Sequence, residues 1–262
     1  MKLQGKIIAI TGASSGVGEQ IAVQTAKLGG TPVLLARTEE RLQILQERLK
    51  REYQTSCIAY QLDVTKDEQV QNVFNRIEQE VGTIDVLINN AGFGKFLSFE
   101  EASLEEVKAM FDVNVFGVVA CIKAVLPAMK QRNSGHIINI ASIAGKIATP
   151  KSSAYAATKH AVIGLSNSLR MELATTNIRV TVVNPGPIQT NFFQIADRSG
   201  QYVESVKRIL LKPEYVAAES LKTIWKYKRE LQLPHWMGLG TLAFALFPRT
   251  FEAVAGNTLR KK

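Results

Sequence analysis

The chain has 262 residues, of which 46% are hydrophobic and 21% are charged. This composition excludes a disordered or fibrous chain and fits one α/β domain that buries a full core. The formal charge of +9 leaves three kinds of anionic partner open, namely a phosphate-bearing cofactor, an acidic membrane surface and nucleic acid.

Apolar residues 7–10 predict the first strand, and a helical pattern resumes after residues 11–18, TGASSGVG. Glycines between a strand and a helix let the backbone approach a pyrophosphate, and the first turn of the helix offers free N–H groups. The strand, turn and helix together predict a dinucleotide site rather than an ordinary tight turn.

Residues 32–36 predict the second strand, which ends at Ala36 and Arg37. Enzymes that prefer NAD usually have a carboxylate here for the ribose 2′-hydroxyl, whereas this chain has a neutral and a cationic residue. Arg37 therefore favours a 2′-phosphate, and hence NADP(H) over NAD(H). The alternative is that Arg37 only begins a solvated basic helix.

Two further strands end in residues that suit ligand binding. Residues 57–62 close on Asp63 and Val64, and Asp63 suits either a contact with adenine or a cap on the turn before the next helix. Residues 85–89 run into Asn90, Ala91 and Gly92. Open parallel sheets bind ligands at such carboxyl ends.

A helix over about residues 113–130 has Asn114 near its start. There the amide can hold a carbonyl or a water, or it can serve only as a cap or packing residue. Residues 137–140 predict a buried fifth strand, so Ser142 lies at a carboxyl end.

Tyr155 and Lys159 are four residues apart on the next predicted helix, so both project from one face. A nearby cation favours a phenolate, and a phenol tuned in this way can act as an acid or a base. Ser142 can hold the oxygen of a carbonyl or hydroxyl substrate meanwhile.

Residues 179–184 predict a sixth strand, closed by Pro185 and Gly186. Because strands and helices alternate throughout, we predict an α/β fold, a single Rossmann-type doubly wound parallel sheet with helices on both faces. Residues 1–190 form the dinucleotide-binding and catalytic core. We expect residues 191–262 to add a loop and helix, a last strand near 230–233 and an apolar tail to the same domain.

Six features follow one another along the chain: TGxxxGxG at 11–18, NNAG at 89–92, Asn114, Ser142, YxxxK at 155–159 and PG at 185–186. Their order and spacing resemble the short-chain dehydrogenase/reductase family over about residues 5–190. Three residues between Gly12 and Gly16 resemble the short oxidoreductase members rather than the longer epimerase-type members.

The resemblance implies an oxidoreductase that interconverts a small-molecule carbonyl and an alcohol, with a substrate lid at the start of residues 191–262. Arg37 predicts that its cofactor is NADP(H) rather than NAD(H). By position, Tyr155 donates or accepts the proton, Lys159 lowers its pKa and binds the nicotinamide ribose, Ser142 orients the substrate oxygen, and Asn114 holds a water. The predicted cofactor-binding residues are Gly12, Ser14, Ser15, Gly16, Val17, Gly18, Arg37, Asp63, Val64, Asn90, Ala91, Gly92, Tyr155, Lys159, Pro185, Gly186, Ile188 and Thr190. The alternative is a sensor or scaffold that binds a dinucleotide without turnover.

The remaining expectations concern partners and location. Without a sustained basic and aromatic groove, we expect no nucleic-acid partner. Cys57 and Cys121 have no CxxC spacing and the three histidines are scattered, so we expect no metal and no disulfide. The first apolar run is too short for a secretory signal, which predicts a cytoplasmic protein.

The tail over 236–262 departs from the family pattern. Its apolar run, residues 236–247, is shorter than the about 20 residues that cross a bilayer, and Arg249 and the basic end follow it. We expect a surface helix that contacts a membrane interface peripherally, contacts a partner subunit in a homodimer or homotetramer, or closes the substrate pocket.

Overall fold

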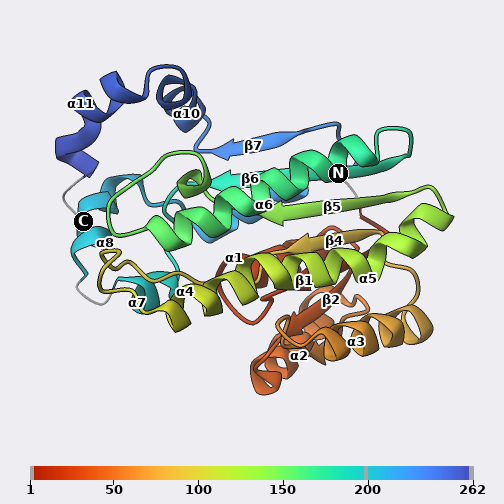
Figure 1. The fold of residues 1–262 in the computed structure, drawn as a ribbon. Helices are drawn as coiled ribbons and strands as arrows, with labels where there is room; N and C mark the ends of the chain where they lie inside the picture. The colour runs from red at the N-terminus through yellow and green to blue at the C-terminus, as the bar shows by residue number, and fades with distance from the viewer. Residues whose placement is uncertain (1–2, 198–199, 260–262) are drawn as a thin grey trace.

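The computed structural model describes residues 3–197 and 200–259 (Figure 1). Its centre is a seven-stranded sheet in the order β3-β2-β1-β4-β5-β6-β7, and every neighbouring pair is parallel. The strands are β1 (Ile7–Thr11), β2 (Thr31–Ala36), β3 (Ile58–Gln61), β4 (Val86–Asn89), β5 (Gly135–Ile140), β6 (Ile178–Pro185) and β7 (Glu230–Leu233). The predicted α/β fold class is confirmed.

Helices connect these strands and cover both faces of the sheet. In chain order they are α1 (Gly16–Lys27), α2 (Glu39–Tyr53), α3 (Asp67–Glu80), α4 (Leu104–Phe111), the π-helical η1 (Asp112–Phe116), α5 (Gly117–Gln131), η2 (Ile143–Gly145), α6 (Ser153–Glu172), α7 (Phe192–Ala196), α8 (Gln201–Val206), η3 (Lys207–Ile209), α9 (Pro213–Leu221), α10 (Met237–Leu246) and α11 (Pro248–Leu259).

The core is divided by the sheet into two apolar clusters. On one side Ala9 of β1 packs in a cluster with residues of α3, α5 and α6, and on the other side Ile8 and Ile10 pack with residues of α1, α2 and α9. This alternation is the two-residue period of a strand. Because helices cover both faces, the strands read as continuous apolar runs in the sequence.

The helix that carries Asn114 is longer than predicted. It begins at Leu104 rather than near residue 113, and Ser103 is its N-cap residue. The Ser103 side chain accepts a hydrogen bond from the backbone N–H of Glu106, and the Glu106 side chain accepts one from the backbone N–H of Ser103. The Ser103 and Glu106 pair of this capping box is a sequence signal for a helix that begins at Leu104. Asn114 therefore lies in the middle of a continuous helical segment, within the π-helical turn η1.

Among the described residues, one helix, Leu104–Gln131, is long and apolar enough to cross a bilayer by length and composition alone. Its Val118, Ile122 and Val125 are buried in the core on one face of the sheet. The helix is therefore a core element of this fold.

The tail forms two successive helices beyond the edge strand β7 (Figure 1). The predicted apolar helix is α10, and α11 packs back on it through Phe244 and Phe251, whose ring centroids are 5.4 Å apart. The predicted basic end at residues 260–262 lies outside the described residues.

Candidate active site

One cavity of about 1050 Å³ lies along the carboxyl ends of β1 to β6. Ser142, Tyr155 and Lys159 line it. So do all the predicted cofactor-binding residues except Gly18. Residues predicted from seven separate parts of the chain therefore meet at the carboxyl ends of the strands.

The glycine turn between β1 and α1 is built for a close approach of backbone. Gly12 and Gly16 have φ of +66° and +57°, in the left-handed region that favours glycine. Gly18 lies under the turn, where a Cβ would come within 2.2 Å of the Gly12 carbonyl oxygen. Any larger residue would push α1 away from the turn, so Gly18 shapes the cavity without lining it.

The first turn of α1 offers its N–H groups to this cavity edge, because the N-cap residue, Ser15, makes no side-chain capping hydrogen bond. Such an end binds anions, which fits the pyrophosphate of a dinucleotide. The donors, the glycine conformations and the position at the strand ends together fit the predicted cofactor.

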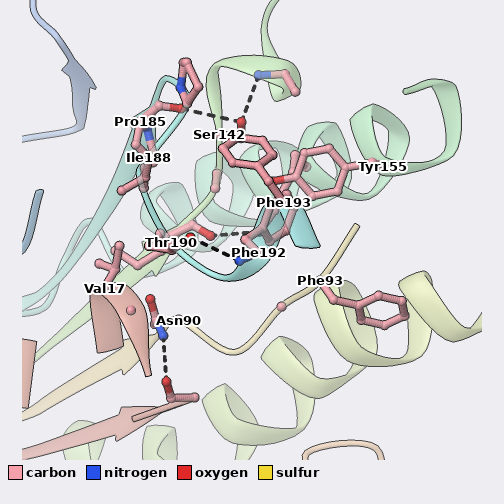
Figure 2. A pocket seen from close by; sticks show the side chains of 18 of the residues that line it. Val17, Asn90, Phe93, Ser142, Tyr155, Pro185, Ile188, Thr190, Phe192 and Phe193 are labelled. Carbon is pink, nitrogen blue, oxygen red and sulfur yellow. Dashed lines mark hydrogen bonds between the residues drawn. The ribbon is translucent and has the colours of Figure 1, made fainter. Parts of the chain in front are cut away.

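Asn90 holds the turn after β1 against the turn after β4. Its Nδ2 donates to the carbonyl oxygens of Thr11 at 3.0 Å and Gly12 at 3.2 Å, and one of these bonds is drawn in Figure 2. Thr11 Oγ1 accepts from the backbone N–H groups of Asn90 and Ala91, each at 3.0 Å. These bonds make the Asn90-Ala91-Gly92 segment part of the same rigid edge.

The far end of the cavity is basic. Arg37 and Arg41 both line it and are exposed, and within the described residues neither has a carboxylate partner. Asp63 also lines this end, but its Oδ1 accepts from Thr65 N at 3.0 Å and Thr65 Oγ1 at 2.8 Å. Asp63 therefore caps the turn before α3, the second of its two predicted roles, while it borders the cavity.

The other end holds the candidate catalytic residues. Ser142 Oγ accepts from Ala144 N at 3.1 Å and lies 3.5 Å from the Pro185 carbonyl oxygen, both drawn in Figure 2. The Ser142 side chain lies near enough to the Tyr155 phenol to act on its pKa. Lys159 Nζ lies 5.8 Å from the centroid of the Tyr155 ring and donates to the Ile140 carbonyl oxygen at 3.0 Å. The predicted trio is thus one connected group.

Burial controls the pKa values of this group. It raises the pKa of Tyr155 well above its usual value, while the Ser142 side chain acts in the opposite direction. Burial lowers the pKa of Lys159 to about 8. The sequence predicted that Lys159 lowers the pKa of Tyr155. In the structure the pKa of Tyr155 is raised instead, because burial disfavours both the Tyr155 phenolate and the Lys159 ammonium. Tyr155 is therefore held as a protonated phenol.

Asn114 does not line the cavity. It is fully buried, its Nδ2 donates to the Phe93 carbonyl oxygen at 2.8 Å and to Thr158 Oγ1 at 3.0 Å, and its Oδ1 accepts from Phe93 N at 3.0 Å. This amide fastens the loop after β4 to the catalytic helix α6. The geometry makes Asn114 a positioning residue, and the water that the resemblance implies stays a prediction.

Sequence reasoning missed an aromatic wall beside Tyr155, which we define as Phe96, Phe192, Phe193 and Tyr202. The Phe192 ring lies 5.6 Å from that of Tyr155 between centroids, and Phe96 contacts the rings of all three other members. The adjacent pair Phe192-Phe193 was the only local signal. Their meeting with Phe96 is a tertiary contact that no sequence spacing shows.

A glycine turn, a basic end and a Ser-Tyr-Lys group with buried Tyr155 and Lys159 meet at the carboxyl ends of the strands, which defines an α/β protein with a candidate dinucleotide site. Residues 6–199 match the short chain dehydrogenase family. The chain belongs to the short-chain dehydrogenase/reductase family of oxidoreductases, as its motifs predicted.

Similar proteins and similar solved structures are also named as oxidoreductases or dehydrogenases. Over 190 residues the chain is 41% identical to an uncharacterized oxidoreductase of Staphylococcus saprophyticus, covering 72% of this chain and 81% of that one. An alcohol dehydrogenase from Thermococcus sibiricus, complexed with 5-hydroxy-NADP, is 31% identical with a TM-score of 0.78, covering 87% and 95% of the two chains. A short-chain dehydrogenase/reductase from Burkholderia phymatum, in complex with NAD, is 25% identical with a TM-score of 0.87, covering 95% and 96%.

Proposed function

We propose that this chain is an NADP-dependent oxidoreductase that interconverts a carbonyl and an alcohol. The observation that carries the proposal is the Ser142, Tyr155 and Lys159 group in the same cavity as the glycine turn. The structural neighbours bound to NADP or NAD support a nicotinamide dinucleotide. The glycine turn and the N-terminus of α1 would hold its pyrophosphate, and when bound the nicotinamide supplies or accepts the hydride.

The residues of the chain handle the proton. Tyr155, a phenol whose pKa burial raises further, donates its proton to the carbonyl oxygen during reduction and takes it back from the alcohol during oxidation. Ser142, which lines the same cavity as Tyr155, holds the same substrate oxygen. Lys159 lies close enough to the ring to stabilise the phenolate that reduction leaves behind.

The test is NADPH oxidation by the purified protein, with and without an added carbonyl compound. We expect the absorbance of NADPH to fall only when the carbonyl compound is present. Tight NADPH binding without turnover of any aldehyde or ketone, over a wide panel, would favour the sensor or scaffold instead.

We predict that the chain prefers NADPH over NADH and that Arg37 supports this preference. A guanidinium paired with a 2′-phosphate contributes about 1.5–3 kcal/mol, so Arg37→Ala should weaken NADPH binding about ten- to a hundredfold and leave NADH binding unchanged. Ala36→Asp with Arg37→Ala should move the preference toward NADH. Calorimetric titration with both cofactors measures this.

The matched control is Arg51→Ala, which removes an exposed arginine at the end of α2 outside the cavity lining. It should leave both affinities as they are. Equal affinity of the unmodified protein for NADPH and NADH would show that Arg37 is only a surface charge.

We further propose that the protein is cytoplasmic and that its tail contacts an anionic membrane surface. On α10, which carries no charged residue, Leu239 and Leu242 are 74% and 55% exposed, and the chain has a net charge of +9. An apolar helix on a cationic protein suits the interface of an anionic bilayer. Leu239→Ser with Leu242→Ser should abolish sedimentation with anionic vesicles, measured at low salt.

The control is Met171→Ser, which removes an apolar side chain that is 78% exposed on α6. It should sediment like the unmodified protein. Light scattering tests the predicted homodimer or homotetramer in parallel. If the α10 variant has a reduced mass and unchanged vesicle binding, α10 is a subunit contact and the membrane proposal fails.

A further inference from the structure

The substrate end of the cavity differs in charge from the cofactor end. Of the charged residues in the described lining, Arg37, Arg41 and Asp63 follow β2 and β3 at the cofactor end, and Lys159 already donates to Ile140. Every other described lining residue is uncharged, including the aromatic wall and, from the tail, Trp236, Met237 and Phe251. A substrate carboxylate or phosphate placed among them would lose its water without gaining a counterion.

The aromatic wall lies against the reacting group itself. Gly94 brings the loop after β4 so close that a Cβ there would come within 2.8 Å of the Tyr155 ring and 2.9 Å of the Phe192 ring. Phe96, farther along the loop, donates its backbone N–H to the Ala196 carbonyl oxygen at 2.8 Å, which ties the loop to α7. A substrate held at Ser142 and Tyr155 therefore has apolar ring surface as its neighbour.

The apolar lining extends well beyond this wall. The cavity lining includes Val206 of α8 and Ile209 of η3. It also includes three residues of the tail, Trp236, Met237 and Phe251. Figure 1 shows α8 and the tail helices at the same end of the sheet, although the chain places them far from β5. Trp236 is 59% exposed and Met237 is buried, so the cavity passes from a buried interior to an open mouth at the start of α10.

We propose that the substrate is an uncharged carbonyl compound, or the matching alcohol, with an extended apolar body. Its reacting oxygen lies at Ser142 and Tyr155, and its apolar body runs past Phe192 toward Met237 and Trp236. This inference rests on the proposed oxidoreductase function and narrows it to a substrate class. It also makes the tail part of the substrate site, the pocket-closing role that the sequence left open.

The test compares ketones that share one skeleton. In the direction of NADPH oxidation, kcat/KM should rise from 2-butanone to 2-decanone by up to about fourfold for each added methylene, the value of burying one CH₂ group. The compound 9-oxodecanoate has the same ten carbons and the same methyl ketone, with a carboxylate at the far end. Its kcat/KM should be about a hundredfold lower than that of 2-decanone, because the carboxylate enters the apolar end unpaired.

A charge introduced at the mouth sharpens the test. Trp236→Lys should raise kcat/KM for 9-oxodecanoate and lower it for 2-decanone. Tyr227→Lys, which adds the same charge at a site that is 89% exposed and outside the lining, should change neither. Melting temperature and NADPH affinity confirm that each variant is folded.

Binding is measured separately from turnover, by calorimetry on the NADPH-loaded Tyr155→Phe variant. We expect 2-decanone to bind and 9-oxodecanoate not to bind. If short polar or charged carbonyls are turned over and 2-decanone is not, the substrate class is wrong while the proposed function stands. If no carbonyl is turned over, the proposed function fails, and absence of 2-decanone binding then overturns the substrate class as well.

Discussion

Tyr155→Phe should reduce kcat about 10²- to 10⁴-fold, the usual contribution of a positioned proton donor or acceptor. The change removes one hydroxyl and leaves the ring that packs against Phe192. NADPH affinity should therefore stay nearly unchanged. Steady-state kinetics with a carbonyl substrate, together with calorimetric titration of NADPH, measures the two quantities separately.

The matched control is Tyr60→Phe, because the Tyr60 hydroxyl is also partly buried and donates to Glu80 at 2.8 Å, away from the cavity. That variant should lose at most about 0.5–1.5 kcal/mol of stability and keep its turnover. If Tyr155→Phe retains more than a few per cent of kcat, Tyr155 is not the proton donor.

Lys159→Ala should lower both kcat and NADPH affinity. Affinity should fall about ten- to a hundredfold if the ammonium also binds the nicotinamide ribose, since charged hydrogen bonds contribute about 1.5–3 kcal/mol. Turnover should fall about a hundredfold or more, because the phenolate left after proton donation loses the cation beside it. Lys159→Met keeps most of the side-chain volume in this buried site and should show the same two losses.

Lys6→Ala is the control for removing a lysine. Lys6 Nζ pairs with Asp85 Oδ1 at 3.1 Å near the amino ends of β1 and β4, the opposite edge of the sheet from the cavity. Loss of this ion pair should slightly reduce the free energy of unfolding and leave kcat and NADPH affinity unchanged. Should Lys159→Ala weaken NADPH binding with kcat unchanged, Lys159 has no part in proton transfer.

Much of the candidate site was predictable because its motifs are local. The glycine turn follows a strand and opens a helix, and Tyr155 and Lys159 are one turn apart, so short-range geometry places each motif correctly. Parallel strands then bring their carboxyl ends to one edge, which is why Asp63, Asn90, Ser142 and Gly186 meet there. The NADP preference, the oligomeric state and the membrane contact stay predictions.

The predictions that depended on surroundings fared less well. The helix that carries Asn114 starts earlier than predicted, because the capping box of Ser103 and Glu106 begins it at Leu104 and the π-helical turn η1 joins α4 to α5 without a break. Asn114 itself is used by Phe93 and Thr158, partners 21 and 44 residues away in sequence. Neither partner could be identified from local spacing.

The family, the fold class and the positions of Ser142, Tyr155 and Lys159 follow from residue periods and spacings, which are properties of near neighbours in the chain. The direction of the Tyr155 pKa shift and the aromatic wall do not follow from such local properties. Burial of Tyr155 depends on packing by Gly94 and Phe192, and the wall requires segments more than ninety residues apart, Phe96 and Phe192, to touch. Such contacts exist only after the sheet has formed and the segments that follow β6 and β7 have folded over the carboxyl ends of its strands.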